Sequence, residues 1–353
     1  MKQDNTPFKP DKPLHVLVVS NHWKVKHNPT NGSIWVDRQV NALKKLGVQV
    51  TTFDVGTSHT PWNVFRKWKE LRQEVQKTQP DLVHARYGTV VGMVSAFSGV
   101  PSVITYAGSD LLVGAGGISK PRIWTGILLS NLASLRATSL ICVSDELRRA
   151  LWWRSNQAVV IPDGVDLEVF KPCPREEARR VLGWKSEEII ILIDPARDPI
   201  RKGLREARAA MEIVREHLPN ARLEVLQVSN PADMPLHCSA ADLLLSASRR
   251  EGSPNMVKEA MACNLPVVST PVGDVPELLA HVQPSAIVPR EPRALAEAML
   301  RLLETPGRSN GREHSQAFSL DLIARRVLEV YKSTINRKPE RARNIAAPFE
   351  PAA

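Results

Sequence analysis

The chain has 353 residues, more than a single hydrophobic core usually organises, so two domains are expected. Hydrophobic residues at 43% and charged residues at 24% are near the globular average, which excludes a collagen-like, coiled-coil or broadly disordered chain. The net charge of +10 favours a polyanionic partner, but it does not choose between nucleic acid, an anionic membrane and nucleotide phosphates.

The first half of the chain alternates short β-branched runs with amphipathic segments of helical spacing. Residues 1–12 are polar and are expected to form a flexible tail. The order strand, helix, strand across residues 13–170 predicts an α/β domain whose parallel sheet is covered on both faces. The expected strands are residues 14–20, 48–55, 81–85, 101–107, 139–144 and 158–162, and the expected helices include residues 33–47 and 63–77.

The alternation pauses at residues 162–184, which contain three prolines and an Asp-Gly pair and are expected to form a linker. A second alternating series across residues 171–318 predicts a second doubly wound domain. Ligands of such sheets bind at the carboxyl ends of the strands, so two facing domains would place a site in the cleft between them. Residues 319–337 have the spacing of a final amphipathic helix, and residues 338–353 are expected to be a flexible tail.

The stretch "REGSPNMVKEAMACNLPVVS" contains two carboxylates, Glu251 and Glu259, around an expected helix start. Ser253 has the residue type of an N-cap, and Pro254 would occupy the first helical position and begin a helix that ends near Cys263. The free backbone N–H groups of this helix tip would suit a phosphate. The two carboxylates would repel a phosphate, so they are expected to accept hydrogen bonds from sugar hydroxyls. A sugar nucleotide is the ligand that this combination implies.

With its two glutamates eight positions apart, this stretch resembles the signature of the family-4 retaining glycosyltransferases of the GT-B fold, and the resemblance extends over residues 14–335. It implies two Rossmann-like domains that face each other across a cleft, with the acceptor on the N-terminal domain and the nucleotide sugar on the C-terminal one. It also implies that the helix at residues 319–337 crosses back to pack on the N-terminal domain.

The resemblance also implies roles for individual residues. The string "RDPIRK" is similar to a family loop in which an arginine and a lysine grip the diphosphate, and these are Arg197 and Lys202 here. Both charges would stabilise the departing diphosphate, with Glu251 as a third catalytic residue. The residues implied in donor binding are Glu259, Gly252, Ser253, Asn255 and Met256, with Gln227 and Val228 at the base.

Two loops of the first half match the family in part. The string "NPTNGS" looks like the family's glycine loop, in which Gly32 would approach the phosphates or the acceptor and Ser33 would start the helix, although many relatives have two glycines there. The string "YAGSD" aligns with a family stretch that often reads His-Gly-x-Asp. Here Ala107 takes the histidine position while Gly108 and Asp110 remain, which puts a contact with the transferred sugar in doubt. Asp110 is expected either to orient an acceptor hydroxyl or to cap the next turn.

The resemblance implies front-face substitution, in which the leaving diphosphate takes the acceptor proton, so no cofactor and no metal are expected. The histidines show no metal-ligand spacing. His84 is interpreted as the end of a strand that faces the cleft, where it either touches an acceptor or has a structural role. The scattered cysteines are typical of a reducing compartment, and the apolar run at residues 14–19 is too short for a secretory signal, so a cytoplasmic protein is expected.

The sequence does not decide the identity of the acceptor, which is either a soluble small molecule or a lipid-linked sugar or surface polysaccharide. Residues 62–77 carry an aromatic stripe bordered by cations, and Trp152 and Trp153 lie among arginines. Either segment could bind the anionic inner face of the cytoplasmic membrane, or it could simply pack on the sheet. Two other classes remain: a non-catalytic sugar-nucleotide binder, which Ala107 favours and turnover would exclude, and a nucleic-acid binder, for which no recognition motif is present. Contact with nucleic acid is not expected.

Overall fold

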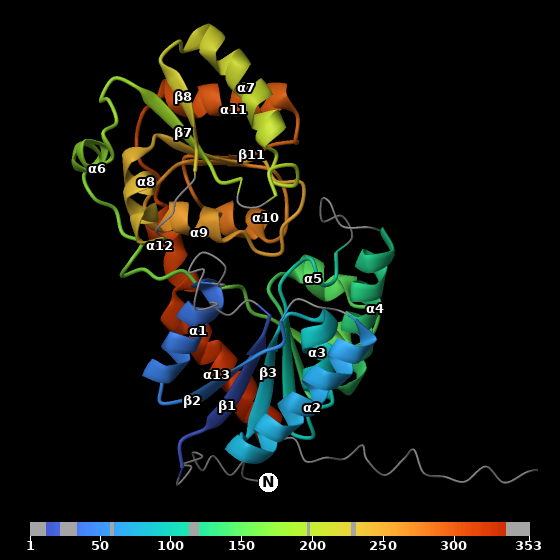
Figure 1. Cartoon of the computed structure of the whole chain (residues 1–353). Coiled ribbons are helices and arrows are strands. Elements are labelled where there is room, and N and C mark those ends of the chain that lie inside the picture. The colour runs from blue at the N-terminus through green and yellow to red at the C-terminus, as the bar shows by residue number, and fades with distance from the viewer. Residues whose placement is uncertain are drawn as a thin grey trace, which may run out of the picture.

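The computed structural model describes residues 12–21, 34–56, 60–112, 120–195, 198–226 and 231–336, which form two α/β halves, each built on a parallel sheet (Figure 1). The prediction of two doubly wound halves is therefore confirmed. In the N-terminal sheet the strands have the order β2-β1-β3-β4-β5-β6, and in the C-terminal sheet the order is β11-β10-β9-β7-β8.

Helices cover both faces of the N-terminal sheet, which explains why strands such as β1 and β3 are buried along their whole length. Helices α2, α3, α4 and α5 lie on one face, and α1 and α13 lie on the other (Figure 1). The elements of this half are β1 (His15–Ser20), α1 (Ile34–Lys45), β2 (Gln49–Asp54), α2 (Pro61–Thr78), β3 (Leu82–Arg86), α3 (Thr89–Ala96), β4 (Ser102–Tyr106), α4 (Lys120–Arg136), β5 (Ser139–Cys142), α5 (Asp145–Ala150) and β6 (Ala158–Val160).

The C-terminal half repeats this plan around a shorter sheet, again with an apolar core on each face. Its elements are α6 (Arg175–Leu182), β7 (Ile189–Ile193), α7 (Leu204–His217), β8 (Ala221–Val225), α8 (Met234–Ala240), β9 (Leu243–Ser246), α9 (Asn255–Ala262), β10 (Val267–Ser269), α10 (Val275–Leu279), β11 (Ser285–Ile287), α11 (Pro292–Glu304), α12 (Gly311–Ser315) and α13 (Leu320–Asn336).

The last helix, α13, returns to the N-terminal half, as expected from the sequence. Ile323, Val327 and Tyr331 are buried in one core cluster with Val16 of β1 and Val36 of α1. Figure 1 shows α13 beside α1, behind the N-terminal sheet. The chain therefore crosses between the halves twice.

The two crossings run side by side. Val165 on the first crossing pairs with Ser319 on the second, through hydrogen bonds of 2.9 Å from the Val165 N–H to the Phe318 carbonyl and from the Leu320 N–H to the Val165 carbonyl. Val165 and Phe170 pack in the core of the C-terminal half, although the sequence placed residues up to 170 in the N-terminal domain.

The prediction of a linker at residues 162–184 is partly wrong, because residues 175–182 form helix α6. Pro174 starts this helix and Gly183 ends it in the left-handed conformation. Arg179 is buried and donates hydrogen bonds to the carbonyls of Ala240 and Glu188 while it pairs with Asp242 at 2.7 Å. This buried network fixes α6 to the C-terminal half. The turn-forming residues in this stretch of sequence gave no indication of a helix.

Both sheets reverse their strand order at one point, between β1 and β3 and between β7 and β9. Ligands of doubly wound sheets bind outside the carboxyl ends of the strands at such switch points. Arg86 ends β3, Asp194 follows β7, and Glu251 follows β9 after a short loop. The fold thus carries these three side chains to the gap between the halves.

Candidate functional site

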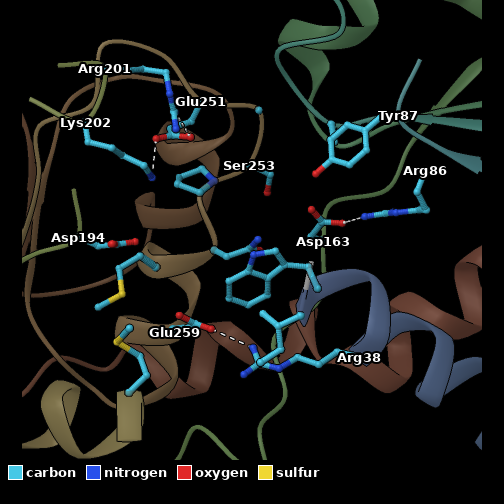
Figure 2. A pocket seen from close by; sticks show the side chains of 18 residues that line it. Arg38, Arg86, Tyr87, Asp163, Asp194, Arg201, Lys202, Glu251, Ser253 and Glu259 are labelled. Atoms are coloured by element: carbon cyan, nitrogen blue, oxygen red, sulfur yellow. Dashed lines mark hydrogen bonds and ion pairs between the residues drawn. The ribbon is translucent and has the colours of Figure 1, made fainter. Parts of the chain in front are cut away.

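A cavity of about 410 Å³ lies between the two halves, a size typical of small-ligand pockets. Both halves line it: Tyr87 and Ala107 come from the N-terminal half, and Lys202, Glu251 and Glu259 come from the C-terminal half. Figure 2 shows Glu251 with Lys202 and Arg201 at one end, Glu259 with Arg38 at another, and Asp163 with Arg86 on the N-terminal side.

Glu251 lies between two cations. Its carboxylate is 2.9 Å from Lys202 Nζ and 2.8 Å from an Arg201 nitrogen, and it accepts a hydrogen bond of 2.8 Å from the Ser248 hydroxyl. Burial opposes the charged form of Glu251, but the two cations outweigh it and hold its pKa below the usual value. The carboxylate therefore stays ionised, and the cations next to it face the cavity.

The N-terminus of α9 points its free backbone groups at the same cavity. Gly252, Ser253, Pro254, Asn255 and Met256 all line it, and no side chain caps the helix start. The buried Oδ1 of Asn255 has no hydrogen-bond partner within the described part of the chain. Exposed N–H groups at the positive end of a helix dipole are suited to an anion.

Ser253 is not the N-cap of α9, which corrects the sequence interpretation. Its hydroxyl donates to Asp274 at 2.6 Å and accepts from Lys258 at 2.8 Å. Because the hydroxyl is occupied by these buried partners, Pro254 takes the cap position and leaves the helix tip open. The helix begins one residue later than predicted, at Asn255.

Glu259 pairs with Arg38 of the N-terminal half across the cleft, with 3.0 Å between a guanidinium nitrogen and Oε1. Arg38 is held in place by the rings of Trp35 and Phe170, at 4.8 Å and 5.1 Å from its central carbon. Burial raises the pKa of Glu259 to about 7, and Arg38 only partly offsets this. The carboxyl thus titrates close to neutral pH.

This raised pKa predicts a pH effect on stability. The folded protein holds the Glu259 proton more tightly than the unfolded chain, in which the pKa is near 4.5. The contribution of Glu259 to the free energy of unfolding therefore falls as pH rises from about 4.5 towards 7. A Glu259→Gln variant has no titratable group at this position, so it does not show this decrease in the free energy of unfolding. We expect its free energy of unfolding, relative to wild type, to rise by up to about 3 kcal/mol between about pH 4 and pH 8, measured by urea unfolding.

Asp274, whose pKa burial raises to about 6, is present in both proteins and cancels in this comparison. If the two proteins lose stability in parallel over the whole range, Glu259 does not titrate as described.

Further contacts join the halves around the cavity. Arg86 pairs with Asp163 at 2.8 Å, and Lys258 Nζ donates to the Asp163 carbonyl at 2.6 Å. Burial opposes the charge on Asp163, but Arg86 and Lys258 lower its pKa below the usual value. Lys258 reaches from α9 to the first crossing, so the helix that carries Glu259 is tied to the segment that joins the halves.

The two backbones approach closely where Ala107 meets Gly252. A Cβ atom built on Gly252 would lie 2.3 Å from the Ala107 carbonyl oxygen, so only glycine fits there. A Cβ atom built on Gly108, at φ +146°, would lie 3.5 Å from the Gly252 nitrogen. Ala107 itself lines the cavity, so the position at which the resemblance leads one to expect a histidine does face the site.

Of the two roles expected for Asp110, the structure supports the cap of a turn and not the orientation of an acceptor hydroxyl. It is buried and accepts hydrogen bonds from the backbone N–H groups of Gly88, Ala107 and Gly108 at 2.8–3.2 Å. One of these bonds supports the loop in which Tyr87, at φ +93°, lines the cavity in a conformation that is costly for a non-glycine residue. Asp110 therefore positions this loop and offers no free oxygen to an acceptor.

His84 does not face the cleft, and of the two roles left open for it the contacts support the structural one. It is buried inside β3, where Nδ1 lies 2.6 Å from the Tyr331 hydroxyl and Nε2 lies 2.8 Å from the Thr105 hydroxyl. Burial lowers its pKa to about 3, so it is neutral. Because β3 continues to Arg86, the residue that reaches the cavity is two positions further along the same face.

The structure brings together most of the predicted site residues that it describes. Arg197, Gln227, Val228, Gly32 and Ser33 lie outside the described residues. The described residues of the predicted donor site all line the cavity: Lys202, Glu251, Gly252, Ser253, Asn255, Met256 and Glu259.

The sequence did not indicate Arg38, Arg86, Asp163 or Arg201 as site residues, yet all four line the cavity. Arg38 stands on an amphipathic helix where a solvated arginine is ordinary, and Asp163 stands in a turn. Only Arg86 could have been predicted as a site residue, because it stands at the carboxyl end of a strand.

Two family models match the chain. The model described as Glycosyltransferase Family 4 matches residues 15–169, and the model described as Glycosyl transferases group 1 matches residues 200–305. An uncharacterized glycosyltransferase of Methanocaldococcus jannaschii is 26% identical in an alignment of length 337 that covers 85% of this chain and 93% of the relative. TuaC of Bacillus subtilis, named for teichuronic acid biosynthesis, is 29% identical over 63% of this chain and 61% of its own length.

Solved structures resemble the whole chain. Sucrose-phosphate synthase from Thermosynechococcus elongatus superposes with a TM-score of 0.73 at 21% identity and covers 91% of this chain and 98% of its own. HepE of Anabaena, solved with UDP and glucose, gives 0.67 at 19% identity over 90% of this chain and 99% of its own. At these identities the likeness establishes the two-domain fold.

Proposed function

This chain belongs to the family-4 glycosyltransferases with the GT-B fold, and we propose that it is a retaining enzyme that moves a sugar from a nucleoside-diphosphate sugar to an acceptor hydroxyl. The observation that carries this proposal is that Lys202, Glu251 and Glu259 lie in one cavity with the open tip of α9. Arg197, the fourth residue of the expected set, remains a prediction.

The chemistry of the cavity supports a diphosphate next to sugar hydroxyls. Lys202 and Arg201 supply positive charge, and the N–H groups of α9 add donors that face the same space. Glu259 lies on the second turn of α9. When its carboxylate leaves the ion pair with Arg38, it can accept hydrogen bonds from hydroxyls of the ligand. HepE and its complexes with UDP and UDP-glucose make a uridine nucleotide the first donor to test.

We propose front-face substitution for the chemical step. The bond between the anomeric carbon and the diphosphate oxygen breaks while the acceptor oxygen attacks from the same face. The acceptor proton passes to the departing diphosphate oxygen. Lys202 stabilises the negative charge that develops there, and this cationic lining supports a mechanism that needs no divalent metal.

The state of the carboxylates in the cavity supports this mechanism over a covalent one. A covalent route needs a carboxylate free to attack the anomeric carbon. Three of the four described carboxylates that line the cavity, Glu251, Glu259 and Asp163, are each engaged by a cation. They are arranged to orient ligands and neighbouring cations rather than to act as nucleophiles.

We propose a saccharide acceptor, either part of a growing surface polysaccharide or linked to a lipid. The support is the likeness to TuaC, whose name refers to a cell-surface polymer. We further propose that the enzyme works in the cytoplasm, which the four free cysteines support.

A screen of UDP-, GDP-, ADP- and TDP-sugars tests this function. We expect a UDP-sugar to raise the unfolding temperature, because a ligand at about 100 times its dissociation constant stabilises by about 2.7 kcal/mol. Slow release of the nucleoside diphosphate by transfer to water is expected with the same donor. Stabilisation without release in the presence of acceptors would favour a non-catalytic binder, and no response to any donor would overturn the proposal.

A further inference from the structure

Helix α4 presents an apolar stripe to solvent. Trp124, Leu128, Leu132 and Leu135 are 54%, 44%, 39% and 51% exposed, and their spacing of three to four residues places them along one side of the helix. In a helix that only covers a sheet, such a stripe faces the sheet. Here it faces outward, so it is available to a partner.

The buried side of α4 explains this reversal. Ser130, Asn131, Ala133 and Ser134 are buried against α3 and the sheet. Tyr106 of β4 donates a hydrogen bond of 2.9 Å to the Ser130 carbonyl. Mostly small and polar side chains, with Ile127 and Leu129, thus make the internal contact, and Trp124 and three leucines are left outside.

Other exposed apolar side chains flank the stripe. Trp152 and Trp153 form an edge-to-face pair just after α5, and the Trp152 N–H donates to Asn131 of α4 at 2.8 Å. On the other side, Arg136 of α4 lies 5.8 Å from the ring of Phe97, which follows α3. The helices α2, α3, α4 and α5 cover the same face of the sheet (Figure 1).

Helix α2 extends this surface with aromatic rings and cations. Trp62 and Phe65 are 75% and 45% exposed, and Lys69 lies 4.6 Å from the Phe65 ring. In all, nine of the fifteen large hydrophobic side chains exposed in the described residues belong to this one face. We call these nine residues the docking face: Trp62, Phe65, Phe97, Trp124, Leu128, Leu132, Leu135, Trp152 and Trp153.

The charges around the docking face are positive. Residues 111–144 contain no aspartate or glutamate, while Arg122 and Arg136 are exposed on α4. Two nearby acidic groups are paired with cations, Glu70 with Lys67 at 2.9 Å and Asp145 with Arg148. Exposed leucine and tryptophan bordered by arginine and lysine are the pattern of proteins that lie on anionic bilayers.

We propose that the docking face binds the surface of a membrane that contains anionic phospholipid. Leucine and tryptophan would enter the boundary between head groups and acyl chains, and the cations would meet lipid phosphates. A second copy of the chain fits less well, because a two-fold interface would bring the same positive surface against itself. None of the described helices is both long and apolar enough to cross a bilayer.

The position of the docking face bears on the acceptor, and this consequence rests on the proposed function. Helix α4 follows the carboxyl end of β4, which is the cleft end of the sheet. Trp124 in the second turn of α4 thus lies nearer to the cleft than Leu135. A lipid-linked acceptor could reach the cavity without leaving the membrane surface.

Flotation with vesicles tests the proposal without any enzymatic activity. We expect the full chain to bind phosphatidylcholine vesicles that contain about 40% phosphatidylglycerol, and to bind pure phosphatidylcholine vesicles at least about tenfold more weakly. Added salt should weaken binding to the anionic vesicles. A double variant, Trp124→Gln with Leu128→Gln, should lower the partition coefficient at least about tenfold.

The matched control is Val181→Gln with Leu322→Gln, which also removes two exposed apolar side chains from helices, outside the docking face. It should bind like wild type. Equal binding of both double variants, or no binding of wild type, overturns the proposal. A wild-type dimer that becomes a monomer only in the Trp124 and Leu128 variant, without vesicle binding, would assign the surface to a second copy and also overturn it.

A measurement on the wild-type protein covers the case in which the variant does not fold. Bromine on the acyl chains quenches tryptophan only when the ring reaches them. We expect brominated anionic vesicles to quench the fluorescence at least about twofold more than soluble bromide does, because tryptophans of the docking face would be buried in lipid. An absence of quenching by the brominated chains would contradict the proposal even if the protein floats.

Discussion

Replacement of Lys202 by alanine should lower the turnover number by about 100- to 1,000-fold, because one charge that stabilises the departing diphosphate is lost. The donor dissociation constant should change by only a few fold, since the α9 tip and Arg201 still hold the phosphates. The fold should survive, because Glu251 keeps Arg201 at 2.8 Å and the Ser248 hydroxyl. Initial rates with saturating donor, combined with calorimetric titration of the donor, separate the two effects.

Two variants calibrate this result. Lys185→Ala removes an exposed lysine of the same half and should leave both quantities unchanged. Lys202→Arg keeps the charge with a different shape and should recover part of the rate. A normal turnover number for Lys202→Ala would mean that this cation does not meet the leaving group.

Replacement of Glu259 by alanine should weaken donor binding by about 10- to 100-fold, the effect of losing a hydrogen bond to a charged group. Turnover at saturating donor should fall much less, since the contact is with the bound sugar nucleotide rather than with the reacting bond. The change also frees Arg38, which otherwise pairs with Glu259 across the cleft. Calorimetric titration with the donor identified by the screen measures the loss.

Glu212→Ala, on the exposed side of α7, is the matched control and should bind the donor normally. Glu259→Gln keeps a hydrogen-bond acceptor and should lose less affinity than Glu259→Ala. Equal affinities of Glu259→Ala and wild type would remove this residue from the donor site.

The fold was predictable because its signals are local. Buried parallel strands such as β7 (Ile189–Ile193) are continuous apolar runs, and helices such as α7 have a clear 3.6-residue period. The helix α6 was missed because turn-forming residues surround it, and its stability depends on the pairing of Arg179 with Asp242, 63 residues away. Such a contact leaves no trace in a local pattern.

The C-terminal part of the site was predictable for the same reason. Lys202, Glu251 and Glu259 lie in short segments whose spacing resembles a known signature, and the backbone places each at the cleft. For His84 only the placement at the cleft was wrong. Strand β3 extends two residues beyond it, so its ring meets Tyr331 and the histidine has the structural role that the sequence left open.

The sequence by itself determined the class of fold, the family and the donor side of the cleft, since each depends on residues close together in the chain. The tertiary structure alone decided that Arg38 meets Glu259, 221 residues away, and that α4 turns three of its leucines outward. The physical reason is the same in both cases. Whether a cation is paired or a leucine is exposed depends on which distant element packs against it, and that is settled only when the whole chain has folded.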